Sequence, residues 1–378
     1  MARGYIAKRS RNSWTLWIEL PPDPATGRRR RQTVTVTGTK RDAQLRLTEL
    51  THQVDMGIPP NTARLTVAEY LGDWLRDVVS VRNRPRTAEG YQIIVDRHIV
   101  PALGSLRLTK LLAGDVERLE AQLLASGLSA NTVHHIHVVL SKALKDALRK
   151  GLVGRNVCQL VEPPRPGRYE VDAPDPGSIA RILDLARQTP YHAAFHVLAF
   201  CGLRRGEAIA MKWTNVDLER GIMSVVATAQ RLKGRGVVSQ PTKSAAGRRG
   251  IALDANTVNV LRAHKAAQAE YRLRLGPLYD DHGLVFGGPS GRPLDPAVLT
   301  RNFEKLAKKA GISGLRLHDL RHGHASGLIK AGVHPRVVQD RLGHASSAFT
   351  MQVYGHVAAG LQADAADAFA GLMAERSG

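Results

Sequence analysis

The chain has 378 residues, more than a single domain usually contains, so two or three domains with ordinary hydrophobic cores are expected. Lys and Arg total 54 against 33 Asp and Glu, and the formal charge of +21 predicts a polyanionic partner, nucleic acid ahead of an anionic membrane surface. The absence of an 18-residue apolar run and of a signal-peptide core argues against a membrane or secreted protein and favours the cytosol. Cys158 and Cys201 fit no disulfide framework or zinc spacing and are predicted to be small packed residues.

Residues 3–60 predict a small sheet backed by one helix, which runs from Thr39 through Asp55. The three short stretches with strand-like alternation are residues 4–10, 13–20 and 31–38. A run of four arginines stands at the entrance to the third stretch: Arg28, Arg29, Arg30 and Arg31. A charge run is usually only a solvated face. Here it adjoins a sheet that is expected to display Trp14 and Trp17, which favours a small DNA-binding module.

A Pro-Asn linker over residues 58–64 precedes a segment, residues 65–155, that predicts a compact helical domain. Four stretches carry the helical pattern: residues 65–79, 86–103, 111–127 and 129–151. Three histidines of the last helix suggest a metal site: His134, His135 and His137. They fall on several helix faces with no carboxylate or cysteine partner nearby in the sequence, so contact with solvent or phosphate is predicted instead of ligation.

Five prolines between Glu162 and Gly177 mark the strongest boundary in the sequence, and the final domain is placed from about Asp175 to the end. It begins helical, short strands are expected within residues 221–232 and 247–254, and the remainder is predicted to be helical. After Tyr354, an acidic segment carries apolar residues at helical spacing: Leu361, Ala365, Ala368, Phe369 and Leu372. This helix either caps its own domain or contacts another protein, and its acidic character favours the second interpretation over DNA binding.

The stretch CGLRRGE, residues 201–207, places Arg204 in a tight connection between two helices, where its side chain can be aimed into a cleft. Its planar charged fork matches two phosphate oxygens, although taken alone Arg204 is better explained as a helix-end ion pair with Glu207. The neighbouring Arg205 is predicted to contact backbone or solvent and to be replaceable. In HDLRH, His318 and Arg321 lie three residues apart and share a helix face.

Three more candidates stand in short motifs: Lys243 in a polar turn between strands, His344 in RLGH and Tyr354 in MQVYGH. The combined set has no carboxylate cluster suited to magnesium and favours nucleophilic attack on a phosphodiester without a metal. The arginines would neutralise charge growing on the non-bridging oxygens, and the tyrosine would attack. A histidine titrates in the right range to take the tyrosine proton, and a lysine near the departing oxygen could act as general acid.

These motifs resemble those of the tyrosine recombinases, the integrases of phages and mobile elements. The resemblance implies six catalytic residues and one supporting acid: Arg204, Lys243, His318, Arg321, His344, the nucleophile Tyr354, and Glu207 beside Arg204. It implies site-specific DNA strand exchange through a 3′-phosphotyrosyl intermediate and a free 5′-hydroxyl, which integrates or excises a mobile element. It also implies that the enzyme needs no metal and no cofactor.

The resemblance assigns residues 1–60 to an arm-type DNA-binding domain, 65–155 to a helical, SAM-like core-binding domain, and 175–378 to an α+β catalytic domain. The expected fold class is therefore mainly α with small β-sheets. The implied partners are double-stranded DNA at core and arm sites, further copies of the chain in a homotetramer, a directionality factor and a host DNA-bending protein, with no membrane. The tail helix would pack into a neighbouring protomer, and the protein would act in the bacterial cytoplasm, associated with the nucleoid when bound.

Three alternatives remain open from the sequence. A type IB topoisomerase uses the same tyrosine chemistry, but the amino-terminal module and the helical tail favour a recombinase. A non-catalytic architectural DNA-binding protein is disfavoured by the complete catalytic set. A metal-dependent hydrolase built on His318, His322 and His324 lacks a ligating acid at a sensible position, and the latter two histidines are predicted to support the fold.

Overall fold

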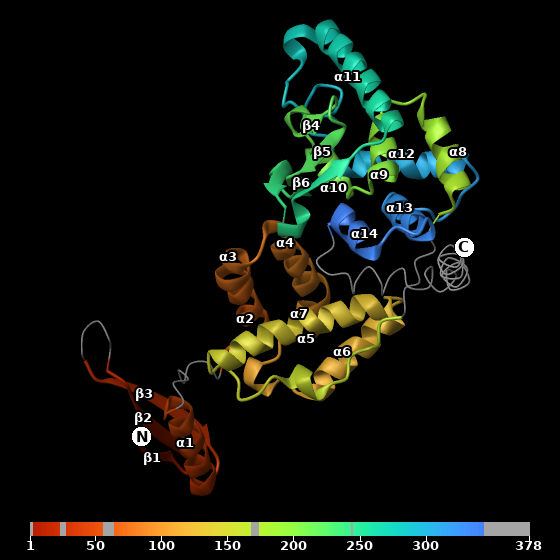
Figure 1. The fold of residues 1–378 in the computed structure, drawn as a ribbon. Coiled ribbons are helices and arrows are strands. Elements are labelled where there is room, and N and C mark those ends of the chain that lie inside the picture. The colour runs from red at the N-terminus through yellow and green to blue at the C-terminus, as the bar shows by residue number, and fades with distance from the viewer. Residues whose placement is uncertain (1–2, 23–27, 56–63, 168–173, 243–244, 344–378) are drawn as a thin grey trace, which may run out of the picture. The chain divides into compact units, whose positions relative to one another are not determined.

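The computed structural model describes residues 3–22, 28–55, 64–167, 174–242 and 245–343 (Figure 1). The chain divides into two compact units, residues 1–168 and 169–378, and each has its own buried apolar clusters. Helices predominate and the sheets are small, as the sequence predicts, and the strands pair antiparallel. Within these described ranges, none of the helices is both long enough and apolar enough to cross a membrane.

The first unit begins with a three-stranded antiparallel sheet whose spatial order follows the chain. Its strands are β1 (Gly4–Ser10), β2 (Ser13–Leu20) and β3 (Arg30–Thr37). Helix α1 (Lys40–Asp55) covers one face of the sheet (Figure 1). Leu16 and Ile18 of β2 are completely buried in a cluster with Leu50 of α1. The sheet and the helix expected from the alternating pattern are therefore confirmed.

The two tryptophans of β2 lie on opposite faces of this sheet because successive strand residues alternate in direction. Trp14 packs against the cluster beneath α1 and donates a hydrogen bond from Nε1 to the carbonyl of Gly38 at 3.0 Å. Trp17 lies on the other face and stacks on Tyr5, with 5.2 Å between the ring centroids. Both tryptophans are half-buried, Trp17 on the open face of the sheet and Trp14 on the face covered by α1.

The rest of the first unit is helical, with two π-helical segments that interrupt two of the expected helices. Its elements are α2 (Val67–Trp74), the π segment η2 (Leu75–Val79), α3 (Ser80–Arg82), α4 (Pro85–Ile94), the π segment η3 (Val95–Ile99), α5 (Val100–Leu103), α6 (Ala113–Ala125) and α7 (Ala130–Arg149). Helix α2 is attached to α7 by two long-range hydrogen bonds. Tyr70 donates to the carbonyl of Ala143 at 2.6 Å, and Trp74 Nε1 donates to Asp146 at 2.9 Å.

One of the three α7 histidines is a core residue with an acidic partner. His137 is 8 % exposed, and its Nδ1 lies 2.6 Å from Oε1 of Glu120 on α6. The prediction that this histidine lacks a carboxylate partner and contacts solvent or phosphate is therefore wrong. The partner lies 17 residues away in sequence and becomes a neighbour only because α6 and α7 pack together.

The second unit combines helices with two small sheets, ordered β4-β5-β8 and β6-β7. Its helices are α8 (Pro176–Ala186), α9 (His192–Cys201), α10 (Arg205–Ala210), α11 (Ala255–Leu275), α12 (Pro296–Lys309), α13 (Asp319–Lys330) and α14 (Pro335–Leu342). Its strands are β4 (Val216–Asp217), β5 (Ile222–Val225), β6 (Ala227–Leu232), β7 (Gly236–Pro241) and β8 (Arg249–Ala252). The alternating pattern predicts β5, β6 and β8 but not β4 or β7.

Helix α9 lies at the centre of the second unit and is buried along nearly its whole length, as its mostly apolar sequence indicates. Phe195 of this helix meets Phe303 of α12 edge to face. The helix ends at Cys201, which is completely buried, as Cys158 is in the first unit. Burial raises the pKa of both thiols to about 12, so both are unreactive packed residues, as predicted.

Candidate active site

The connection between α9 and α10 has the geometry that CGLRRGE predicts. Gly202 closes α9 in the left-handed conformation, with φ of +62°. A Cβ at this position would lie 2.7 Å from side-chain carbons of both His324 and Leu342, so neither the backbone conformation nor the space allows a larger residue. Arg204 follows in an extended conformation and caps the N-terminus of α10. Its side chain therefore leaves the chain at a turn held by tertiary contacts.

Arg204 and Glu207 form the ion pair that the conservative interpretation of the sequence predicts. Nη1 of Arg204 donates to Oε1 of Glu207 at 2.8 Å, and the backbone N–H of Arg204 donates to Oε2 at 3.0 Å. The two side chains differ greatly in exposure, at 41 % for Arg204 and 3 % for Glu207. A buried carboxylate thus orients a guanidinium that still reaches solvent.

A second arginine, which the sequence analysis did not single out, binds the same carboxylate. Arg249 of β8 donates from Nη2 to Oε2 of Glu207 at 2.9 Å and from Nη1 to Oε1 at 3.2 Å, and its side chain is only 6 % exposed. Burial raises the pKa of Glu207, but the hydrogen bonds and charge of Arg249, followed by those of Arg204, outweigh it and leave that pKa below its ordinary value. Glu207 is therefore ionised at neutral pH.

The pattern of strand β8 contains a signal that could have identified Arg249. In an alternating strand, Arg249 shares a face with Ile251, which is 1 % exposed. An arginine at an inward strand position requires a buried partner. The sequence does not identify this partner, because Glu207 lies 42 residues earlier in the chain.

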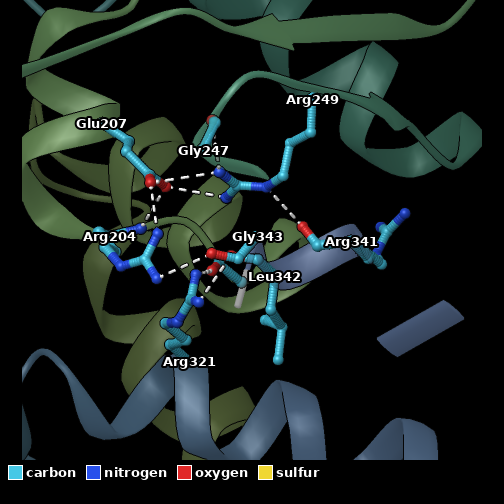
Figure 2. A network of polar contacts seen from close by, with 9 residues as sticks. Arg204, Glu207, Gly247, Arg249, Arg321, Arg341, Leu342 and Gly343 are labelled. Atoms are coloured by element: carbon cyan, nitrogen blue, oxygen red, sulfur yellow. Dashed lines mark hydrogen bonds and ion pairs between the residues drawn. The ribbon is translucent and has the colours of Figure 1, made fainter. Parts of the chain in front are cut away.

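The C-terminal end of α14 brings three arginines together (Figure 2). Three consecutive carbonyls there each accept a hydrogen bond from a different guanidinium: Arg341 O from Arg249 Nε at 2.7 Å, Leu342 O from Arg321 Nη2 at 2.7 Å, and Gly343 O from Arg204 Nη2 at 3.2 Å. The last carbonyls of a helix have no partners within it and carry partial negative charge, so guanidinium groups satisfy them well. His344 is the next residue in sequence.

Two further contacts fix the position of this helix end. Arg321, whose residue surface is 3 % exposed, also donates from Nη1 to the carbonyl of Gly202 at 2.6 Å. Gly343 closes α14 with φ of +66°, and a Cβ there would lie 2.8 Å from the carbonyl of Ala246 and 3.0 Å from Nη1 of Arg249. The glycine of RLGH is therefore required by a close approach of β8 and the segment before it.

His318 stands at the N-terminus of α13 rather than inside the helix, and its ring meets that of His322 edge to face at 5.0 Å. Partial removal from water lowers the pKa of His318, and the positive charges of Arg321 and Arg204 act in the same direction. His318 remains exposed at its surface. The sequence predicts a histidine that titrates near neutrality, whereas this environment favours the neutral imidazole at that pH.

His324 has a structural role, as expected, and does not act with His318 in a metal site. Its Nε2 accepts a hydrogen bond from Nε of Arg341 at 3.1 Å. Burial lowers the pKa of His324 to about 4, and the charge of Arg341 acts in the same direction. In the described part of the chain, no group of three His, Cys, Asp or Glu side chains could hold a metal ion. The residues described here therefore do not supply the ligands that a metal-dependent hydrolase requires.

Arg205 donates from Nη1 to the hydroxyl of Thr300 on α12 at 2.7 Å. Arg205 is exposed, as the expected contact with solvent requires, and it also contacts this side chain, which was not expected. Three predicted catalytic residues lie outside the described residues: Lys243, His344 and Tyr354. The predicted tail helix lies outside them as well.

The four arginines at the start of β3 are all exposed: Arg28 and Arg29 just before the strand, and Arg30 and Arg31 as its first two residues. The last of them pairs with Glu19 of the neighbouring strand at 3.7 Å. At this distance and exposure the pair contributes little to stability. The run therefore presents positive charge to solvent.

Comparison with known protein families gives two matches along the chain. The model of the phage integrase family matches residues 175–360, and the model of a phage integrase N-terminal SAM-like domain matches residues 66–119. An integrase of Streptomyces ambofaciens is 32 % identical over 327 residues, which cover 84 % of this chain and 82 % of that protein. The matched ranges contain all six predicted catalytic residues.

Two solved structures share the fold. The integrase of the transposon Tn1549, in complex with a circular intermediate DNA, has a TM-score of 0.64 at 17 % identity, covering 77 % of this chain and 95 % of that one. A lambda integrase tetramer bound to a Holliday junction has a TM-score of 0.58 at 18 % identity, covering 93 % and 94 % of the two chains.

Proposed function

The chain belongs to the phage integrase family of tyrosine recombinases, and we propose that it is a site-specific DNA recombinase that integrates or excises a mobile genetic element. The observation that carries this proposal is the meeting of Arg204 and Arg321 on adjacent carbonyls at the end of α14, one residue before His344. Two arginines held by backbone contacts form a preorganised site for a phosphodiester anion.

The two arginines contribute differently to this site. Arg204 is exposed enough to donate hydrogen bonds to the non-bridging oxygens of a phosphate. Arg321 is buried, and its charge is fixed by the carbonyls of Gly202 and Leu342. Together they would stabilise the charge that develops on the phosphate as it reacts, without a metal ion.

The remaining roles follow from the motifs of the chain. The hydroxyl of Tyr354 attacks the scissile phosphorus, which forms a phosphotyrosine bond to the 3′ side and breaks the bond to the 5′ oxygen. His318, neutral at physiological pH, or a neighbouring group takes the tyrosine proton, and Lys243 gives a proton to the departing 5′ oxygen. Attack by a 5′-hydroxyl of a partner strand reverses these transfers and rejoins the DNA. His344 donates a further hydrogen bond to the phosphate.

We assign residues 1–60 to arm-type DNA binding, 65–155 to core DNA binding and 175–378 to catalysis. The net charge of +21 and the exposed run Arg28–Arg31 support DNA as the partner. The likeness to a lambda integrase that was solved as a tetramer on a Holliday junction supports a homotetramer. A directionality factor, a host DNA-bending protein and action at the bacterial nucleoid in the cytoplasm complete the proposal.

The test is covalent trapping on nicked suicide duplexes tiled across the genomic DNA on both sides of the gene, in EDTA. The wild-type chain should form a protein–DNA adduct that resists denaturant, and Tyr354→Phe should form none while still binding DNA. The phenolic oxygen is the bond-forming atom, so its loss abolishes the adduct. An adduct that persists in Tyr354→Phe, or that requires a divalent metal, would contradict the proposal.

A further inference from the structure

We propose that Arg249 is a positioning residue for strand cleavage: it shares the carboxylate of Glu207 with Arg204, so that Arg204 keeps positive charge for the scissile phosphate. This inference rests on the proposed function, because it assigns a role within the same site. Arg249 itself is buried and does not meet the substrate.

The geometry of the carboxylate carries the first step. Both oxygens of Glu207 accept from both arginines: Oε1 from Nη1 of Arg204 and Nη1 of Arg249, and Oε2 from the backbone N–H of Arg204 and Nη2 of Arg249. The guanidinium of Arg249 takes the two-pronged arrangement that is the strongest form of this pair. Arg204 is left with a single side-chain bond to the carboxylate.

Charge carries the second step. In the described part of the chain, the ion pairs of both arginines converge on the one carboxylate of Glu207, so the trio retains one positive charge. That charge has to appear where water or a ligand can balance it, because a buried uncompensated charge is costly. Arg249 is 6 % exposed and Arg204 is 41 % exposed. The surplus charge is therefore presented by Arg204.

The third step is that Arg249 also binds two backbone carbonyls near other predicted catalytic residues. Arg249 also donates from Nε to the carbonyl of Arg341 and from Nη1 to that of Gly247, so it ties Glu207 to the end of α14 and to the segment just before β8 (Figure 2). Gly247 lies four residues after Lys243 in sequence, and Arg341 lies three before His344. One side chain thus couples the orienting acid of Arg204 to the segments that lead to two other predicted catalytic residues.

The test is a double-mutant cycle of four proteins: wild type, Arg249→Gln, Glu207→Gln and the double variant. Each is assayed for single-turnover cleavage of a nicked suicide duplex at saturating DNA, for DNA affinity and for thermal unfolding. Arg249→Lys, which keeps the charge without the fork, is a fifth arm. Arg262→Gln removes an exposed arginine that pairs with Glu219, and it serves as the matched control.

Arg249→Gln should cleave about 10²-fold more slowly with DNA affinity within about threefold of wild type, because Glu207 then neutralises Arg204. Removing the carboxylate as well should restore charge, so the double variant should cleave at least about tenfold faster than Arg249→Gln. Arg249→Lys should retain most of the rate, and Arg262→Gln should equal wild type. A purely structural role predicts that cleavage falls and recovers together with thermal stability, whereas charge sharing predicts slow cleavage by Arg249→Gln molecules that remain folded.

Two outcomes would overturn the inference: Arg249→Gln cleaving at the wild-type rate, or a folded double variant cleaving no faster than Arg249→Gln. If Arg249→Gln does not fold, the decisive comparison is the double variant against Glu207→Gln, because neither contains the buried carboxylate of Glu207. Those two should then agree within about threefold, and a difference of about 10²-fold would reject charge sharing. Failure of the proposed function is a separate result, since the wild-type chain would then form no adduct at all.

Discussion

Two buried glutamates in this chain have similar exposure and different surroundings. Glu120 of α6 meets the equally buried His137, and the pair is enclosed by the helical core of the first unit. Glu207 of α10 meets two arginines, one buried and one reaching solvent. In the first arrangement, the buried carboxylate of Glu120 has a hydrogen-bonding partner inside the core. The second uses a buried acid to hold surplus positive charge at a surface where an anion can bind.

Breaking the Glu120–His137 pair should give the largest effect, and this effect should be on the free energy of unfolding and not on cleavage. His137→Leu leaves the carboxylate of Glu120 buried without this partner, and we expect a loss of about 3 kcal/mol in the free energy of unfolding. The double variant His137→Leu, Glu120→Leu should recover part of this loss because no polar group is stranded. Urea unfolding monitored by circular dichroism measures both, and equal stability of His137→Leu and wild type would refute the assignment.

Removing the exposed arginine of the other group should affect chemistry more than folding. Arg204→Ala should slow strand cleavage by about 10²-fold or more, because it removes one preorganised charge donor. The adjacent Arg205→Ala loses only a bond to Thr300 and should cleave within a few-fold of wild type. Adduct formation per folded molecule compares the two, and equal tolerance at both positions would reject the role given to Arg204.

A buried histidine of the second unit, unlike His137, has no acidic partner among its described hydrogen bonds and should make stability depend on pH. His196 of α9 is 3 % exposed and contacts the hydroxyl of Thr257 at 3.0 Å, and burial lowers its pKa to about 4. The unfolded chain, with an ordinary pKa near 6.5, takes up the proton first as pH falls, so stability is full above that value and is lost as pH drops toward 4.

Between pH 7 and pH 5, His196 should account for about 2 kcal/mol of this loss. Urea titrations of wild type and His196→Gln at the two pH values measure it. The variant should lose less stability on acidification than wild type. Parallel losses in the two proteins would assign the acid sensitivity to other groups.

The features that the sequence predicted well are those encoded over a few residues. The turn at Gly202 and the contact between Arg204 and Glu207 span three residues or fewer, so capping rules expose them directly. The three strands of the first sheet follow from an alternating pattern with clear turns. The same alternation separates Trp14 from Trp17, and this consequence was missed because both were considered together.

The features that the sequence did not reveal depend on contacts between distant segments. Glu120 and His137 are joined by helix packing, and Glu207 and Arg249 by the fold of the second unit, which brings β8 within side-chain reach of α10. A local sequence pattern does not identify a partner from a distant segment, because any acidic residue in the chain could have been that partner. The short strand β7 was missed because its polar, glycine-led sequence gives a weak strand signal.

The sequence by itself determined the helical class, the basic charge, the left-handed turns and the order of the catalytic motifs, since each depends on residue type and spacing along the chain. Tertiary structure alone decided that three arginines, from the N-cap of α10, from β8 and from α13, meet on three successive carbonyls at the end of α14. The physical reason is that a helix end offers unsatisfied carbonyls to whatever packs against it, and only the packing selects which guanidinium groups arrive.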